Sequence, residues 1–216
     1  MYLDTEARDR IGAAVLIVWN SAALIGLTIK IARVIPNASH AGPLLQCISL
    51  GTSATFFVFQ IYFLAVRLPS IARTAGPMPR ACALLGAYLP AVITMLPTGT
   101  SEGLQLAAAL VTTSGMAGAL YALIYLGNAF SVFPQARRLV TTGPYQFIRH
   151  PLYLFGELSV LGIALGYAQP WALLMAMFSF LAQFPRMTYE EKILTTAFDS
   201  YPTYAAKTAR LIPGVY

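Results

Sequence analysis

Long stretches without a charged side chain are the feature that most constrains how this chain can fold. Residues 11–29 and 44–66 contain no Asp, Glu, Lys or Arg, and the shorter stretch 81–97 is also uncharged. A fourth stretch runs uncharged over residues 103–136, with Pro134 near its end. Because about 20 apolar residues in a helix cross the roughly 30 Å hydrocarbon core of a bilayer, these lengths predict four transmembrane helices.

Two further apolar segments, 151–169 and 170–185, follow and are separated by a short turn at residues 166–170. Both are short for a complete crossing, so they predict a helical hairpin that is either shallow, tilted or a pair of crossings. The expected fold is an all-α, polytopic membrane protein with five to six membrane segments. Residues 1–130 form its transmembrane helices, and residues 131–216 form a more polar C-terminal region of the same structural unit.

Charge supports this topology independently. Only 10% of the residues are charged, against about 25% in soluble domains. If the chain crosses six times from a cytoplasmic N-terminus, only Lys30 and Arg33 of the 14 Lys and Arg residues lie on the far side. The positive-inside rule therefore predicts that both termini are cytoplasmic. The net charge of +6 is explained by this topology and by anionic membrane lipids, so we expect no nucleic-acid partner.

We expect no metal site. The chain has two histidines, His40 and His150, and neither lies in an HExxH pattern. Cys47 and Cys82 lack paired spacing and are interpreted as packing residues.

Polar residues gather in the segment 141–153 that leads into the fifth apolar stretch. Pro151 suits the first position of a helix, where its missing N–H costs nothing. His150 would then lie at the helix cap, beside backbone N–H groups that favour an anion. Tyr145 and Tyr153 offer aromatic faces for a cation or an adenine ring. A juxtamembrane loop with interfacial tyrosines and snorkelling arginines explains the same residues equally well.

A second polar group, Glu190 and Glu191, follows the last apolar segment. Arg186 lies four residues before Glu190 and can pair with it on a helix. Adjacent helical side chains point about 100° apart, so we expect one glutamate to face the site near Arg149 and the other to pair outward. A solvated helix exit is the plainer interpretation.

Glu157 lies about two turns inside the fifth apolar segment, where an ionised carboxylate is costly. We expect it to face a cavity or a partner, and Arg149 and Gln183 are the candidate partners. It would then either bind substrate, handle a proton, or make a structural hydrogen bond.

Three groups of residues together resemble the isoprenylcysteine carboxyl methyltransferase superfamily, which is similar to membrane phospholipid methyltransferases and includes small bacterial members. They are Thr142-Gly143-Pro144-Tyr145, Arg149-His150-Pro151-Leu152-Tyr153, and Glu190-Glu191 with Leu194, Phe198, Tyr201 and Tyr204. The resemblance covers residues 137–213. It implies methyl transfer from S-adenosylmethionine to a lipophilic acceptor at the cytoplasmic face of a bacterial inner membrane. The acceptor classes it implies are a prenylcysteine-like carboxylate, a lipid amine or a small thiol.

The resemblance also implies roles for residues. Arg149 and Glu191 would lie nearest the methyl transfer. The cofactor would be held by Gly143, Tyr145, His150, Pro151, Tyr153, Glu190 and Tyr204. Phe155 stands where the family usually has glycine, so we expect it to narrow the pocket. Phe155 and Glu157 are therefore the expected determinants of the acceptor.

Two other functions compete with methyl transfer. Membrane sterol reductases end in a similar fold that holds NADPH, although they are longer and this chain shows no extra basic cluster for a ribose phosphate. A non-catalytic membrane protein is the third possibility, because a general base other than the glutamates is not evident.

Overall fold

The computed structural model describes residues 5–38, 41–97 and 102–214, so His40 lies outside the described residues. The long helices are α1 Thr5–Val34, α2 Ala41–Ala65, α3 Pro77–Ile93, α4 Glu102–Leu126, α5 Pro151–Tyr167 and α6 Pro170–Ala197. The shorter elements are helix α7 Tyr201–Ala205, strands β1 Ala72–Arg73 and β2 Gln135–Ala136, and 3-10 helices at Ile35–Asn37, Gly127–Ala129 and Gly143–Gln146. The predicted all-α class is confirmed.

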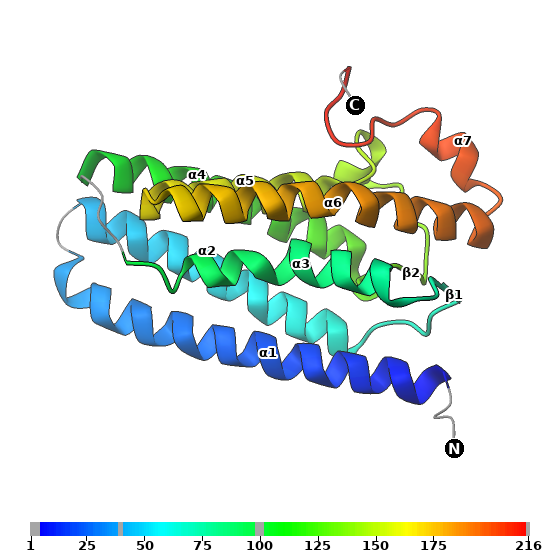
Figure 1. The fold of residues 1–216 in the computed structure, drawn as a ribbon, viewed down its shortest axis with the longest axis horizontal. Coiled ribbons are helices and arrows are strands. Elements are labelled where there is room, and N and C mark those ends of the chain that lie inside the picture. The colour runs from blue at the N-terminus through cyan, green and yellow to red at the C-terminus, as the bar shows by residue number, and fades with distance from the viewer. Residues whose placement is uncertain (1–4, 39–40, 98–101, 215–216) are drawn as a thin grey trace.

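The long helices run back and forth as one bundle, and both ends of the described chain lie at the same end of it (Figure 1). Helix α4 packs against α5, and α3 packs against α6. Among the described residues, three ranges are long and apolar enough to cross a membrane, namely Asp9–Val34, Gly42–Ala65 and Gly103–Ala129. Helices α3 and α5 are apolar but shorter. The bundle is therefore compatible with a membrane along most of its length.

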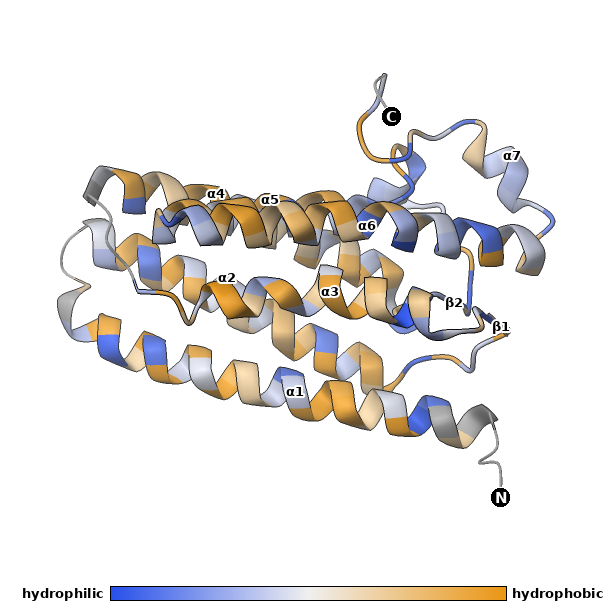
Figure 2. Ribbon diagram, in the orientation of Figure 1, coloured by the Kyte–Doolittle hydropathy of each residue, from blue (hydrophilic) through white to orange (hydrophobic). Residues whose placement is uncertain are grey.

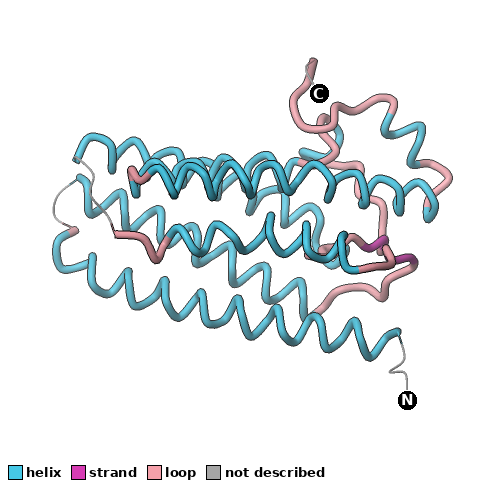
Figure 3. Tube along the Cα trace, in the orientation of Figure 1, coloured by secondary structure: helices cyan, strands magenta, loops and turns pink. Residues whose placement is uncertain are grey.

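The fourth apolar stretch leaves the α-helix well before Pro134. Helix α4 stops at Leu126, because Gly127 adopts a left-handed backbone with φ of 55°. The chain then reaches β2, which pairs antiparallel with β1. Figure 3 shows this small sheet and most of the longer loops at the end of the bundle where α5 begins.

The predicted hairpin is formed by α5 and α6, which turn through Ala168 in a left-handed conformation. Helix α6 passes through Pro185 and continues to Ala197. Pro185 removes one backbone hydrogen bond from the helix. The polar side chains of the turns that follow it have partners, which are described below.

Small residues on α4 permit its close packing on α5. A Cβ atom on Gly115 would overlap the backbone of Ser159, and one on Gly118 would overlap the ring of Phe155. The two helices can therefore approach closely only because these positions are glycine.

Hydrophobic residues predominate along the middle of the bundle, and hydrophilic residues are more frequent toward its ends (Figure 2). At the end that holds α7, Asp9 of α1 pairs with Arg67 at 2.9 Å and with Arg137 at 3.0 Å. The side chain of Arg137 is fully buried. These ion pairs fasten the start of α1 to the segments that follow α2 and α4.

Candidate functional site

The segment 142–150 forms a tight loop whose shape depends on Gly143. This residue has φ of 60°, and a Cβ atom there would overlap the ring of Tyr125. The chain then makes a 3-10 turn and enters α5 with His150 as its cap and Pro151 as its first residue. The predicted cap arrangement is thus confirmed.

The C-terminal segment holds this loop in place. The backbone N–H of Arg149 donates to Ala209 O at 2.8 Å, and that of His150 donates to Arg210 O at 3.2 Å. The hydroxyl of Tyr204 donates to Tyr145 O at 2.6 Å. The loop and the chain terminus therefore form one unit against the polar end of α6.

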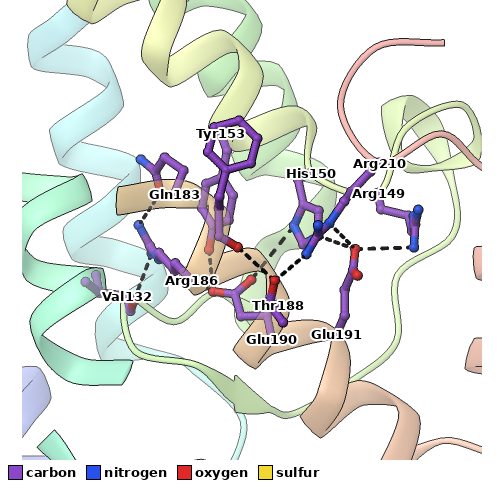
Figure 4. A network of polar contacts seen from close by, with 11 residues as sticks. Val132, Arg149, His150, Tyr153, Gln183, Arg186, Thr188, Glu190, Glu191 and Arg210 are labelled. Atoms are coloured by element: carbon purple, nitrogen blue, oxygen red, sulfur yellow. Dashed lines mark hydrogen bonds and ion pairs between the residues drawn. The ribbon is translucent and has the colours of Figure 1, made fainter. Parts of the chain in front are cut away.

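On one side of the site, Glu191 is surrounded by Arg149, His150 and Arg210 (Figure 4). Its Oε1 atom lies 3.0 Å from His150 Nε2, 3.1 Å from Arg210 Nε and 3.3 Å from Arg149 Nη1. Glu191 lies beyond the apolar part of α6. Its burial alone would raise the pKa of the carboxyl group, but the hydrogen bond with His150 and the charges of Arg149 and Arg210 outweigh burial and lower it.

Glu190 faces α5 from the adjacent position. The hydroxyl of Tyr153 donates a hydrogen bond to Glu190 Oε1, and Arg186 Nε lies 3.6 Å from the same atom. His150 Nδ1 lies 4.0 Å from Glu190 Oε2. The pairing of Arg186 with Glu190 is confirmed, whereas the expectation that one glutamate points outward is wrong. Glu190 has a partner on α5 and Glu191 has a partner on the C-terminal segment, so both carboxylates are paired although they point in different directions.

Tyr153 is held on both faces of its ring. The imidazole of His150 stacks on it, with ring centroids 5.4 Å apart and planes 4° from parallel. The guanidinium of Arg186 lies 4.5 Å from the ring centroid, an arrangement that favours a cation–π interaction. Arg186 also donates to Val132 O at 2.8 Å. The ring is consequently fixed in position.

A polar cavity of about 100 Å³ lies beside this network. Predicted site residues in its lining are Tyr145, Arg149, His150, Tyr153, Glu190 and Tyr204. Burial raises the pKa of Tyr204 to about 12 and raises that of Tyr145 still further, so both phenols are neutral at physiological pH. The described residues that line this cavity do not include Gly143, Pro151 or Glu191. They shape the loop and hold His150.

A larger cavity of about 550 Å³ lies deeper in the bundle and is lined mainly by apolar side chains of α1, α2, α3 and α5. Leu152 and Tyr153 line both cavities, so they form the boundary between the polar space and the apolar space. Glu157 lines the larger cavity. Phe155 does not narrow either lining, because its ring packs against Gly118 of α4.

Glu157 is fixed by hydrogen bonds from α6. Gln183 Nε2 donates to Glu157 Oε1 at 2.7 Å, and Ser179 Oγ donates to the same oxygen at 3.0 Å. Both donors also lie 3.1 Å from Gly86 O of α3. The expected partner Gln183 is confirmed, and Arg149 is not the partner because its side chain is engaged by Glu191.

Sequence reasoning left several members of the site without a role. Arg210 could not be placed because its contact with Glu191 requires the chain terminus to fold back onto the loop. The spacing of Arg186 to Glu190 signalled their pairing but not the contact of Arg186 with Tyr153. Ser179 lies outside the sequence motifs, and Tyr201 belongs to the tail motif without having been given a role. Among the described residues, no group of three or more His, Cys, Asp or Glu could hold a metal ion.

Comparison with known proteins yields a family and two relatives. Residues 101–200 match the family model described as phospholipid methyltransferase. Nickel-cobalt-cadmium resistance protein NccN from Alcaligenes xylosoxydans xylosoxydans is 30% identical over 132 residues, which cover 56% of this chain and 59% of that protein. Cobalt-zinc-cadmium resistance protein CzcN from Cupriavidus metallidurans is 29% identical over 97 residues, which cover 44% of this chain and 43% of that protein. The chain thus spans about half the length of these curated relatives.

The family match confirms the resemblance seen in the loop and in the Glu190-Glu191 pair. Together with the apolar helices, it supports an integral membrane protein and membrane methyl transfer in general.

Proposed function

We propose that this chain, which is similar to phospholipid methyltransferases over much of its C-terminal half, transfers a methyl group from S-adenosylmethionine to a lipophilic acceptor. One observation supports this most strongly. Tyr153 separates a polar cavity from a larger apolar cavity and lines both. A reaction between a charged cofactor and a greasy acceptor needs two such spaces that meet at one point, because each substrate then keeps a suitable environment.

The residues around the polar cavity fit the proposed cofactor. Arg149 and Tyr201 both line the polar cavity and lie next to one another, so the guanidinium and the hydroxyl can together bind a carboxylate or another acceptor. Glu190 offers a carboxylate to amino or hydroxyl groups, and Tyr145 offers an aromatic face to adenine. When bound, S-adenosylmethionine supplies a methyl group on a positively charged sulfur.

The proposed roles differ among the charged residues. Arg149 lines the polar cavity, and its proposed place is near the transfer. Glu191 contacts Arg149 and His150 from outside the lining of described residues, which favours a positioning role. Ligand pockets typically enclose about 300–1000 Å³, so we expect the polar cavity to widen when the cofactor binds.

The acceptor would reach the larger cavity from the bilayer, while the cofactor would enter from the cytoplasm. The distribution of Lys and Arg supports a cytoplasmic position for the end of the bundle that holds the polar site. A prenylcysteine-like carboxylate, a lipid amine and a small thiol are the proposed acceptor classes.

A binding measurement tests this function. We expect S-adenosylhomocysteine to raise the melting temperature of the detergent-purified protein and NADPH to leave it unchanged. His150→Ala and Glu190→Ala should abolish the shift, while the exposed control Asp199→Asn should retain it. A shift with NADPH alone would favour the reductase, and no shift with either ligand would favour a non-catalytic protein.

A further inference from the structure

The larger cavity contains a carboxylate, that of Glu157. Both hydrogen bonds from Gln183 and Ser179 reach Oε1 of Glu157. Oε2 receives neither of these two hydrogen bonds. Because Glu157 lines an otherwise mainly apolar space, this oxygen is the one that a bound molecule would contact.

An unsatisfied acceptor lies on a different helix of the same cavity. Gln60 of α2 is only 8% exposed, and its Oε1 atom has no hydrogen-bond partner in the described part of the chain. Gln60 also lines the cavity. Burying such an oxygen without a partner is unfavourable, so a bound molecule that donates hydrogen bonds would be stabilised there.

The position of Glu157 connects it with the boundary between the two cavities. Tyr153 and Glu157 are four residues apart on α5, so they lie on one face about one turn apart. On α6, Arg186 donates to Gln183 Oε1 at 3.4 Å, and Gln183 donates to Glu157. A group bound by Glu157 would consequently lie close to Tyr153, where the cavities meet.

Two cationic residues, Arg186 and Lys30, also line this cavity. Arg186 is paired with Glu190 and bonded to Val132 O. Lys30 is an exposed residue near the opposite end of α1 from Asp9. Near Glu157, the charge of Arg186 is therefore already paired with Glu190.

Building on the proposed methyl transfer, we propose that Glu157 and Gln60 form an acceptor-recognition subsite, and that the acceptor is an amphiphile with a hydrogen-bond-donating head group and not a carboxylate. An amine or a hydroxyl group can donate a hydrogen bond to either oxygen. A second carboxylate would offer no donor and would be repelled by Glu157 in an environment of low dielectric constant.

Tryptophan fluorescence can measure this preference. Trp19 lines the cavity, and Trp171 is the other of the two tryptophans. In a Trp171→Phe background, the protein would be placed in phosphatidylcholine nanodiscs at pH 7.5. Dodecylamine, dodecanol and dodecanoate have equal chain lengths and would be titrated separately. We expect dodecylamine and dodecanol to bind at least about tenfold more tightly than dodecanoate.

Matched variants assign the preference to the subsite. Glu157→Gln keeps an oxygen for Gln183 and Ser179 but removes the charge, so the preference for dodecylamine should fall to less than about threefold. Gln60→Leu should weaken dodecanol binding, and Asp199→Asn should change neither. Equal or tighter binding of dodecanoate by the parent protein would overturn the proposal even if a variant failed to fold.

The result is separable from the proposed function. If S-adenosylhomocysteine binds but dodecanoate is not disfavoured, the subsite proposal fails and methyl transfer stands. If the amphiphile preference is present without binding of S-adenosylhomocysteine, the subsite stands and the methyltransferase proposal fails.

Discussion

The Tyr153 hydroxyl of α5 donates a hydrogen bond to the Glu190 carboxylate of α6, and both residues line the polar cavity. The same tyrosine ring borders the larger apolar cavity. This pair therefore joins the two helices of the C-terminal hairpin at the point where the proposed cofactor and acceptor would meet.

Removing this hydroxyl tests whether the pair shapes the cofactor site. Tyr153→Phe keeps the ring between His150 and Arg186 but leaves Glu190 without its phenol donor. Hydrogen bonds to charged groups contribute about 1.5–3 kcal/mol, so we expect S-adenosylhomocysteine to bind about 10- to 100-fold more weakly by isothermal titration calorimetry. The exposed control Tyr62→Phe should bind normally. Unchanged affinity in Tyr153→Phe would show that the hydrogen bond between Tyr153 and Glu190 does not shape the cofactor site.

The lowered pKa of Glu191 predicts a pH-dependent contribution to stability. Folding lowers the pKa from its ordinary value of 4.5, so the ionised carboxylate stabilises the fold fully above pH 4.5. That contribution is lost as the pH falls through the lowered folded-state value. We expect Glu191→Gln to melt below the parent protein at pH 7 and the difference to shrink toward pH 3 in thermal unfolding scans. A difference that is constant with pH would contradict the role of this charge.

The ion pairs at the start of α1 predict a large loss of stability on removal of Asp9. The Asp9→Ala change leaves the fully buried Arg137 side chain without its carboxylate partner. Breaking a buried pair typically costs about 3–5 kcal/mol. We expect a markedly lower melting temperature in detergent, whereas Asp199→Ala at an exposed position should have little effect. Similar melting of both variants would show that the cluster contributes little.

The close contact of α4 with α5 can be tested with two glycines. Gly115→Ala places a methyl group against the backbone of Ser159, which cannot rotate away. We expect destabilisation of about 1–3 kcal/mol. In Gly51→Ala, the added Cβ has no neighbour within 4 Å among the described residues, so this helical control should melt at or above the parent temperature. Equal effects at both positions would mean that helix propensity, not packing, determines the change.

The sequence was informative where local chemistry decides the structure. Uncharged lengths predicted the membrane-compatible helices, and Pro151 predicted the start of α5 with His150 at its cap. The end of α4 was not predictable from hydropathy, because Gly127 ends the helix through its backbone conformation while the sequence remains apolar.

Contacts between residues that are far apart in the sequence are the part of the site that could not be predicted. The spacing of Arg186 and Glu190 is local, so their pairing could be predicted. The contact between Glu191 and Arg210 depends on a backbone bridge between Ile148 and Ala209, which no periodicity reveals. The position of Phe155 could not be predicted either, because its contact with Gly118 depends on how α4 and α5 cross.

Methyl transfer in a defined membrane tests the central claim most directly. Protein in nanodiscs would be incubated with methyl-labelled S-adenosylmethionine and an extract of membrane lipids, and label in the lipid phase would be counted. We expect time-dependent labelling by the parent protein and Asp199→Asn, and loss of at least about 100-fold in Glu190→Ala and Arg149→Ala. Absence of labelling by a parent protein that is folded would contradict the claim, as would equal labelling by all variants.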